Sequence, residues 1–274
     1  MTSAADPFLA FDEAIALETV GDGRLRADIA PGWDIRGNPH GGYLLSMVVA
    51  AGVGAIEQND PISVAANYLA PPRFGEADLV TEVIRAGRRQ STVEVRLGQA
   101  GTECVRAVIT YGTLSDESPT LWGSDVVAPP LPTPDRCADL QAVIREEGED
   151  VRLHERVELR LHPETGWIRG KPSGVPQFDG WLRFVDGREP DPLALLLYSD
   201  GFPPSIFEAV GLDVGHVPTV QLTTHLFARP APGWVQARFR TRVRGGGFVD
   251  EDGELWDSTG RLVATTRQLA LVRD

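Results

Sequence analysis

Asp200 and Gln268 are the residues whose types and positions in this 274-residue chain most suggest catalysis. An internal repeat with a spacing of 158 residues pairs Asp200 with Gly42 and Gln268 with Thr110. The segments that share this spacing are 67–72 with 225–230 and 104–107 with 262–265. The sequence therefore predicts a duplicated domain in which only the second copy carries an acid at this position.

A carboxylate and an amide of this kind could together hold and activate a water molecule. Asp200 follows the apolar run 195–197, and burial raises the pKa of an aspartate, which makes it a better base near neutral pH. The amide of Gln268 can both donate and accept hydrogen bonds. The alternative is structural: Asp200 beside Gly201 could cap the end of a helix, and Gln268 could be an exposed strand residue.

His40, Gly41 and Gly42 stand before the apolar stretch 43–51, which predicts a helix buried on most sides. The N-terminus of a helix presents free N–H groups and a partial positive charge, which suit a carbonyl oxygen that becomes an oxyanion. Glycine lets such a carbonyl approach the backbone closely. We therefore expect these three residues to bind substrate. Helix packing would explain the glycines equally well, and a structural hydrogen bond would explain His40.

The composition excludes several classes of function. A formal net charge of −13 argues against nucleic acid as a partner, because phosphate binding needs a basic face. No apolar run approaches the ~18 residues of a membrane span, and residues 1–6 carry no secretory signal. The two cysteines suit a reducing compartment, and no zinc-ligand spacing is present. We expect a cytoplasmic protein with no metal, cofactor or membrane partner.

Arginines gather at roughly matching places in the two copies. They are Arg85, Arg88 and Arg89 in the first copy and Arg238, Arg240, Arg242 and Arg244 in the second. A local cluster can bind a small polyanion even in an acidic chain, so a coenzyme phosphate site is one interpretation. Residues two apart on a strand point the same way, so a solvated strand face is the other.

The order of elements predicts an α+β pattern in each half, a buried helix followed by four antiparallel-looking strands. The first unit is 1–114, with strands expected at 63–69, 77–85, 92–97 and 103–114. The second unit is 151–274, with a helix at 192–200 and strands at 157–161, 180–185, 217–227, 234–243, 253–257 and 261–272. Pro203-Pro204 should kink or break that helix.

The segment 115–150 is predicted to be a linker with one short helix. Its proline-rich part, 129–134, cannot form a central strand, and 145–150 is a run of charged residues.

Four short motifs, in this order, resemble the double hotdog acyl-CoA thioesterases of the thioesterase II (TesB-like) family. They are His40-Gly41-Gly42, Tyr198-Ser199-Asp200, Pro218-Thr219 and Thr265-Thr266-Arg267-Gln268. The resemblance covers nearly the whole chain outside the linker. It implies two tandem hotdog domains, each an antiparallel sheet wrapped around one long helix. It also implies hydrolysis of fatty or other acyl-CoA and, since the family often assembles further, a homo-oligomer of double hotdog chains.

In that family an Asp, a Thr and a Gln jointly orient the attacking water, which implies Asp200, Thr219 and Gln268 as catalytic residues. The strand after Thr219 is one residue longer than the family pattern, so Thr223 is an alternative. A hotdog hydratase acting on enoyl- or hydroxyacyl-CoA is a second hypothesis, but it needs a nearby His, and none follows Asp200 before His216. A non-catalytic acyl-thioester binding protein is the third.

Overall fold

The strands of both halves of the chain form one continuous antiparallel sheet. The computed structural model describes residues 9–123, 126–146 and 151–272, and in these ranges thirteen strands follow the order β1-β2-β6-β7-β8-β5-β12-β15-β14-β13-β11-β10-β9. Their bounds are β1 Glu18–Gly21, β2 Arg24–Ile29, β5 Asp60–Tyr68, β6 Gly75–Arg85, β7 Ser91–Gln99, β8 Thr102–Gly112, β9 Ala138–Asp139, β10 Val157–Leu161, β11 Gln177–Phe184, β12 Thr219–Leu226, β13 Val235–Gly245, β14 Phe248–Trp256 and β15 Leu262–Leu271. Two short strands, β3 (Asp34–Ile35) and β4 (Asn38–Pro39), pair separately.

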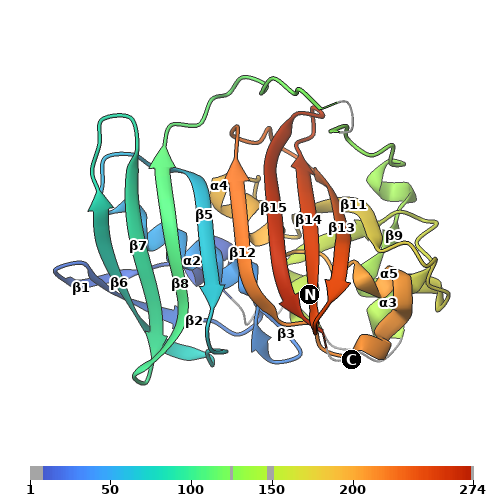
Figure 1. Ribbon diagram of the computed structural model, residues 1–274, viewed down its shortest axis with the longest axis horizontal. Coiled ribbons are helices and arrows are strands. Elements are labelled where there is room, and N and C mark those ends of the chain that lie inside the picture. Colours follow the sequence, from blue (N-terminus) through green and yellow to red (C-terminus); the bar gives the residue numbers. More distant parts are fainter. Residues whose placement is uncertain (1–8, 124–125, 147–150, 273–274) are drawn as a thin grey trace, which may run out of the picture.

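The two halves of the sheet mirror one another about its centre (Figure 1). Going outward, the first half has β5-β8-β7-β6-β2 and the second has β12-β15-β14-β13-β11. β5 and β12 pair at the centre, with Ala66 opposite Leu222 and Val64 opposite Thr224. The repeat in the sequence therefore corresponds to a repeated structure, and the predicted fold class, an α+β double hotdog, is confirmed.

The central helix of the first half is α2 (Gly41–Val53). It begins at Gly41 because His40 caps it, with the His40 side chain accepting a hydrogen bond from the Tyr43 N–H. Its apolar residues are buried on nearly all sides, as the pattern predicts. The sheet covers one side, and α4 (Pro192–Tyr198) from the second half packs against another.

The second half divides its helix in two. Asp191 caps the N-terminus of α4, and Pro192 occupies the first turn, where its missing N–H is not needed. The helix ends at Tyr198, two residues earlier than the pattern predicts, and α5 (Ile206–Val210) follows after Pro203-Pro204. Asp200 therefore lies in a turn after α4 rather than on the helix. No helix in the described ranges is long and apolar enough to cross a membrane.

Several elements differ from the pattern-based expectation. The strands β1 and β2 precede α2, where we expected none, and a short helix α1 (Phe11–Ala14) comes before them. β14 begins five residues earlier than expected, because acidic residues on its outer face interrupt the apolar pattern. In the predicted linker, β9 joins the sheet edge beside β10, and α3 (Leu140–Glu146) is the short helix. Residues 147–150 of the charge run, like 1–8, 124–125 and 273–274, lie outside the described residues.

Candidate active site

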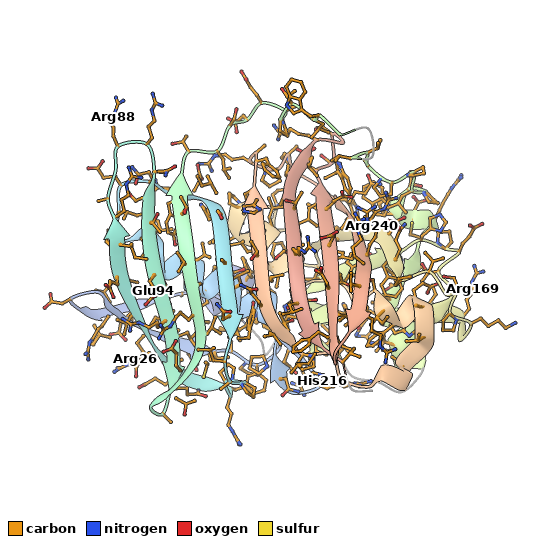
Figure 2. The ribbon with its side chains drawn as sticks, in the orientation of Figure 1. Arg26, Arg88, Glu94, Arg169, His216 and Arg240 are labelled. Carbon is orange, nitrogen blue, oxygen red and sulfur yellow. The ribbon has the colours of Figure 1, made fainter. Side chains whose placement is uncertain are left out.

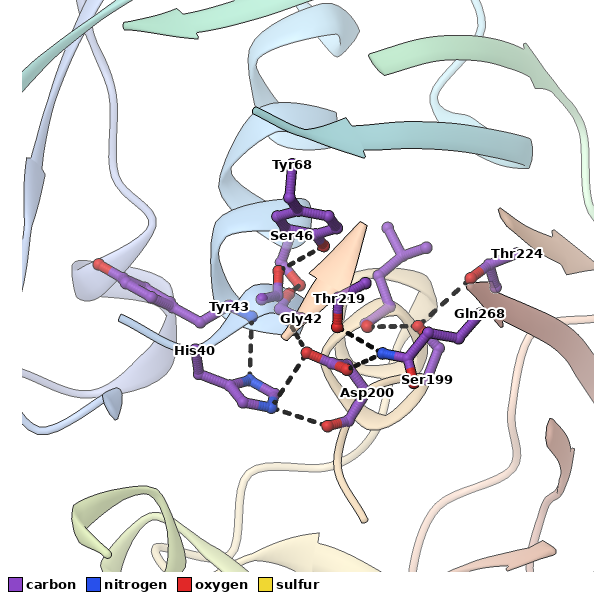
Figure 3. Close-up of polar contacts among 12 residues, drawn as sticks. His40, Gly42, Tyr43, Ser46, Tyr68, Ser199, Asp200, Thr219, Thr224 and Gln268 are labelled. Carbon is purple, nitrogen blue, oxygen red and sulfur yellow. Dashed lines mark hydrogen bonds and ion pairs between the residues drawn. The ribbon is translucent and has the colours of Figure 1, made fainter. Parts of the chain in front are cut away.

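Asp200 lies where α2 meets the turn after α4, and both halves of the chain hold its carboxylate (Figure 3). Its Oδ2 accepts a hydrogen bond from the Gly42 N–H at 3.0 Å. Its Oδ1 accepts one from the Gln268 Nε2 at 2.9 Å. Gly42 and Asp200 are the two residues that the repeat pairs, so the acid bonds to its own counterpart in the other copy. The Asp200 side chain is 14% exposed and is not sealed from solvent.

Gln268 joins Asp200 to Thr219. Its Nε2 donates to the Asp200 carboxylate and also to the Thr219 Oγ1. Gln268 lies on the face of β15 that meets the helices. The burial of Thr266 and Ala270, which share that face, indicates this orientation. The structure therefore brings the three expected catalytic residues into one hydrogen-bonded group.

Thr223 is not part of this group. Its neighbours on β12, Leu222 and Thr224, are fully buried against the helices. Thr223 shares the other face of the strand with Gln221 and His225, which are exposed. Of the two threonines, only Thr219 contacts Gln268 in the structure.

His40 connects the start of α2 to Asp200 through both ring nitrogens. Its Nδ1 accepts from the Tyr43 N–H at 3.3 Å, and its Nε2 lies 2.8 Å from the Asp200 backbone oxygen. A backbone N–H can only donate and a carbonyl can only accept, so the geometry specifies the tautomer with hydrogen on Nε2. Nε2 is also 3.4 Å from the Asp200 Oδ2. Because the protein engages both nitrogens, the geometry favours the structural role for His40 over a contact with substrate.

Gly41 and Gly42 allow the two central helices to approach closely. A methyl group on Gly41 would lie 2.6 Å from the Asp200 Oδ2, and one on Gly42 would lie 2.5 Å from the backbone oxygen of Leu197. The Gly42 N–H, one of the expected oxyanion donors, is occupied by Asp200. The Gly41 N–H has no hydrogen-bond partner among the described residues.

The surroundings of Asp200 make its carboxyl group harder to ionise than a carboxyl group in water. Burial raises the pKa of Asp200 above its ordinary value, although His40, the Gly42 N–H and the Gln268 amide each oppose that shift. The O–H of Tyr68 donates to the Gly41 carbonyl at 2.8 Å. Burial and the charge of Asp200 raise the pKa of Tyr68. Tyr68 therefore stays a neutral donor, while Asp200 gains the basicity that a general base needs.

Glu251 is a second buried carboxyl group at this site, and none of the sequence motifs includes it. It is 7% exposed, and its Oε2 accepts a hydrogen bond from the Ser205 N–H at 2.6 Å. Burial raises the pKa of Glu251 to about 7, and the negative charge of Asp200 contributes to this shift. The sequence does indicate that Glu251 is buried, since it alternates along β14 with the apolar residues Val249 and Leu255. Both of these residues lie on the same face and are buried.

The raised pKa of Glu251 predicts a pH-dependent stability. Between its ordinary value of 4.5 and about 7, the folded protein holds a proton that the unfolded chain has lost. Glu251 should therefore lower the free energy of unfolding as pH rises through this window, by on the order of 3 kcal/mol, with no further change above it. Urea unfolding of the parent and a Glu251→Gln variant at pH 5 and pH 7.5 measures this as a difference. Equal pH dependence of the two proteins would contradict it.

The arginines of β13 are engaged by carboxylates of the sheet. The ion pairs are Arg238 with Asp179, Arg240 with Glu254 and Arg242 with Asp252. In the first half, by contrast, Arg88 extends away from the body of the protein at the β6–β7 turn (Figure 2). For the three β13 arginines the geometry favours the solvated strand face over a phosphate site.

Comparison with known families finds a match for each half of the chain. Residues 29–112 match the N-terminal domain of acyl-CoA thioesterases, and residues 134–272 match the C-terminal domain. The chain belongs to the acyl-CoA thioesterase family. In this thioesterase-family protein, the N-terminal match contains His40, Gly41 and Gly42, whereas the C-terminal match contains Asp200 and its two partners.

Individual proteins are similar to this chain over most of its length. The chain is 33% identical over 260 residues to uncharacterized proteins of Mycobacterium tuberculosis and Mycobacterium bovis, with 88% of each chain covered. Among solved structures, it is similar to a candidate thioesterase II from Thermobifida fusca, with 28% identity, a TM-score of 0.87 and coverage of 98% of this chain and 99% of that one. The acyl-CoA thioesterase II of Mycobacterium marinum shares the fold at 19% identity and a TM-score of 0.73, over 96% of this chain and 98% of that one.

Proposed function

We propose that this protein hydrolyses the thioester bond of acyl-CoA with a water molecule oriented by Asp200, Thr219 and Gln268. The observation that carries the proposal is the double donation of the Gln268 amide, to the Asp200 carboxylate and to the Thr219 hydroxyl oxygen. Both oxygens lie within hydrogen-bond distance of one nitrogen, so a single water can reach both. A thioester is an activated acyl group, and a positioned water with a base is sufficient for its hydrolysis.

In this mechanism the water donates to Asp200 and accepts from Thr219. Because Gln268 donates to the Thr219 oxygen, the hydrogen of that hydroxyl stays free to point at the water. The water oxygen attacks the thioester carbon while its proton passes to the Asp200 carboxylate. The C–S bond then breaks, the proton returns to the departing thiolate, and the products are a carboxylic acid and the CoA thiol.

The N-terminus of α2 would stabilise the oxyanion of the tetrahedral intermediate. The Gly41 N–H and the partial positive charge of the helix N-terminus offer preorganised stabilisation next to the Asp200 carboxylate. The carbonyl of Gly41 is itself fixed by the Tyr68 hydroxyl. The first copy would thus supply the groups that stabilise the oxyanion, and the second copy would supply the base.

A hydratase is the second candidate, because the structure brings a histidine to the acid after all. The expectation that Asp200 lacks a nearby His is wrong in three dimensions, since His40 reaches it from the other half of the chain. Hydration of an enoyl thioester needs an acid and a base that both meet the substrate. The His40 side chain is only 3% exposed, and both of its nitrogens have partners in the protein. Hydrolysis by a water at Asp200 fits this geometry better.

The decisive experiment separates three activities with one set of substrates. Saturated acyl-CoAs of graded chain length are assayed for thiol release, and enoyl-CoAs are assayed in parallel for loss of the conjugated double bond. Thiol release from saturated acyl-CoA supports the thioesterase. Hydration without thiol release would indicate the hydratase, and saturable binding without turnover would indicate a binding protein.

Gln268→Ala is expected to lower kcat roughly 10- to 100-fold with little change in KM, because the amide orients the base and the water rather than binding the acyl chain. Steady-state thiol release measures the effect. Gln221→Ala is the matched control, since Gln221 is exposed on the outer face of β12, and it should behave as the parent. Activity of Gln268→Ala within twofold of the parent would remove Gln268 from the mechanism.

A further inference from the structure

Glu251 occupies a position that the proposed mechanism does not yet use. It stands on β14 directly opposite Gln268 on β15, and both residues are on the face that meets the helices. Side chains directly opposite one another on one face of an antiparallel pair have Cβ atoms about 4.5–5.5 Å apart and interact. The buried carboxyl of Glu251 is therefore the immediate neighbour of the Gln268 amide on the side away from β12.

The Glu251 carboxyl is held in place from the helix side. Its Oε2 accepts the Ser205 N–H, and the Ser205 hydroxyl forms a hydrogen bond of 2.8 Å with the Thr241 hydroxyl on β13. Ser205 belongs to the segment that follows Asp200 and leads into α5. Glu251 thus links the chain just beyond the candidate base to the strand beside Gln268.

The Gln268 amide has a required orientation. Its NH2 group donates to Asp200 and to Thr219, which uses both of its hydrogens. The amide oxygen must then point away from these two residues and needs a donor. A carboxylate offers only acceptors, whereas a protonated carboxyl group offers one O–H.

We propose that Glu251 is a positioning residue that donates its carboxyl proton to the side-chain oxygen of Gln268 and so keeps the amide NH2 directed at Asp200 and Thr219. This inference rests on the proposed thioesterase function. Ionised Glu251 would face the amide oxygen with acceptors alone and would favour the reversed amide. The reversed amide would turn its oxygen toward the Asp200 carboxylate and disrupt the water site.

The electrostatics around Glu251 favour the protonated form. Burial is the main cause of its raised pKa, the Ser205 hydrogen bonds oppose the shift, and the charges of Asp200 and Asp252 add to it. On the adjoining strands, Arg267 pairs with Asp250 and Arg242 with Asp252, and Arg240 pairs with Glu254. His40 acts on Asp200 from the α2 side. An ionised Asp200 therefore makes it harder for Glu251 to lose its proton, because the second negative charge would be repelled by the first.

The test compares pH profiles of kcat/KM for acyl-CoA hydrolysis in the parent, Glu251→Gln and Glu251→Ala. In the parent, activity should rise as Asp200 loses its proton and then fall, by about tenfold per pH unit above 7, as Glu251 ionises. Glu251→Gln carries a permanent N–H donor, so it should match the parent near pH 6 and show no fall above pH 7. Glu251→Ala should lose tenfold or more in kcat across the profile.

Asp250→Asn, on the same strand but on its outer face, is the matched control and should keep the parental profile. An alkaline fall that persists unchanged in Glu251→Gln would overturn the role of Glu251 while leaving the thioesterase intact. An inactive parent would instead overturn the proposed function and this inference with it. The Glu251→Gln profile decides the question even where Glu251→Ala fails to fold.

Discussion

Replacement of Asp200 by Asn should lower kcat for acyl-CoA hydrolysis by roughly 10³-fold, the largest loss of activity expected from any single change in this protein. The substitution keeps the size of the side chain and its acceptor for the Gly42 N–H, but it removes the group that takes the proton from water. Substrate binding does not depend on that proton, so KM should change little. Steady-state thiol release and single-turnover measurements together would separate the chemical step from binding.

The control for Asp200→Asn is Asp250→Asn, which neutralises an ion-paired carboxylate on the outer face of β14. It should leave kcat within about twofold of the parent, since surface ion pairs contribute little. Asp250→Asn should also unfold at nearly the parental temperature, whereas Asp200→Asn exchanges the acceptor for Gln268 for a donor and should lose the stability of that one hydrogen bond. An Asp200→Asn enzyme that keeps a tenth of the parental kcat would exclude Asp200 as the base.

Gly42→Ala should give the largest loss of stability, about 2–3 kcal/mol in the free energy of unfolding. A methyl group at this position would lie 2.5 Å from the backbone oxygen of Leu197 and 3.0 Å from its Cα. Neither atom can move aside without separating α2 from α4, and that separation exposes the apolar contact on which the two halves pack. Urea unfolding followed by circular dichroism measures the change.

Gly41 and Gly54, at the two ends of α2, provide the comparison for Gly42. At Gly41 the added methyl group would meet the Asp200 carboxylate, a side-chain end that can rotate away only by giving up its hydrogen bonds to Gly42 and Gln268. Gly41→Ala should therefore lose less stability than Gly42→Ala and should lose activity. At Gly54, which ends α2 with φ −69°, nothing lies within 4 Å of the added methyl, so Gly54→Ala should change neither property. Equal stability of the Gly42 and Gly54 variants would show that the contact between the helices is looser than the structure has it.

Much of the fold could be predicted from local pattern, because the information is in the spacing of side chains. The alternation of apolar residues located β5, β6, β12 and β13 to within a few residues, and the unbroken apolar run located α2. Edge strands such as β1 and β9 escaped prediction, since they are short and bury little. The break after α4 followed from Pro203-Pro204, but its place before Asp200 did not, because several turns of helix are compatible with the same residues.

The candidate site, like the fold, could be predicted from the sequence only in part. The asymmetry of the repeat singles out Asp200 and Gln268 from the sequence, since one copy has an acid and an amide where the other has Gly42 and Thr110. The choice of Thr219 over Thr223 depends on an irregularity in β12 between Thr219 and Gln221, and such a slip changes which side chains face the helices.

The contacts between the two copies could come only from the tertiary structure. His40 and the Gly42 N–H reach Asp200 across sequence separations of about 160 residues, and Glu251 meets Gln268 only when β14 and β15 pair in one register. Residue type and spacing report the chemistry that a side chain can perform and the face on which it lies. Which groups surround it depends on how the two halves close against each other, and burial and proximity then set the protonation of Asp200 and Glu251.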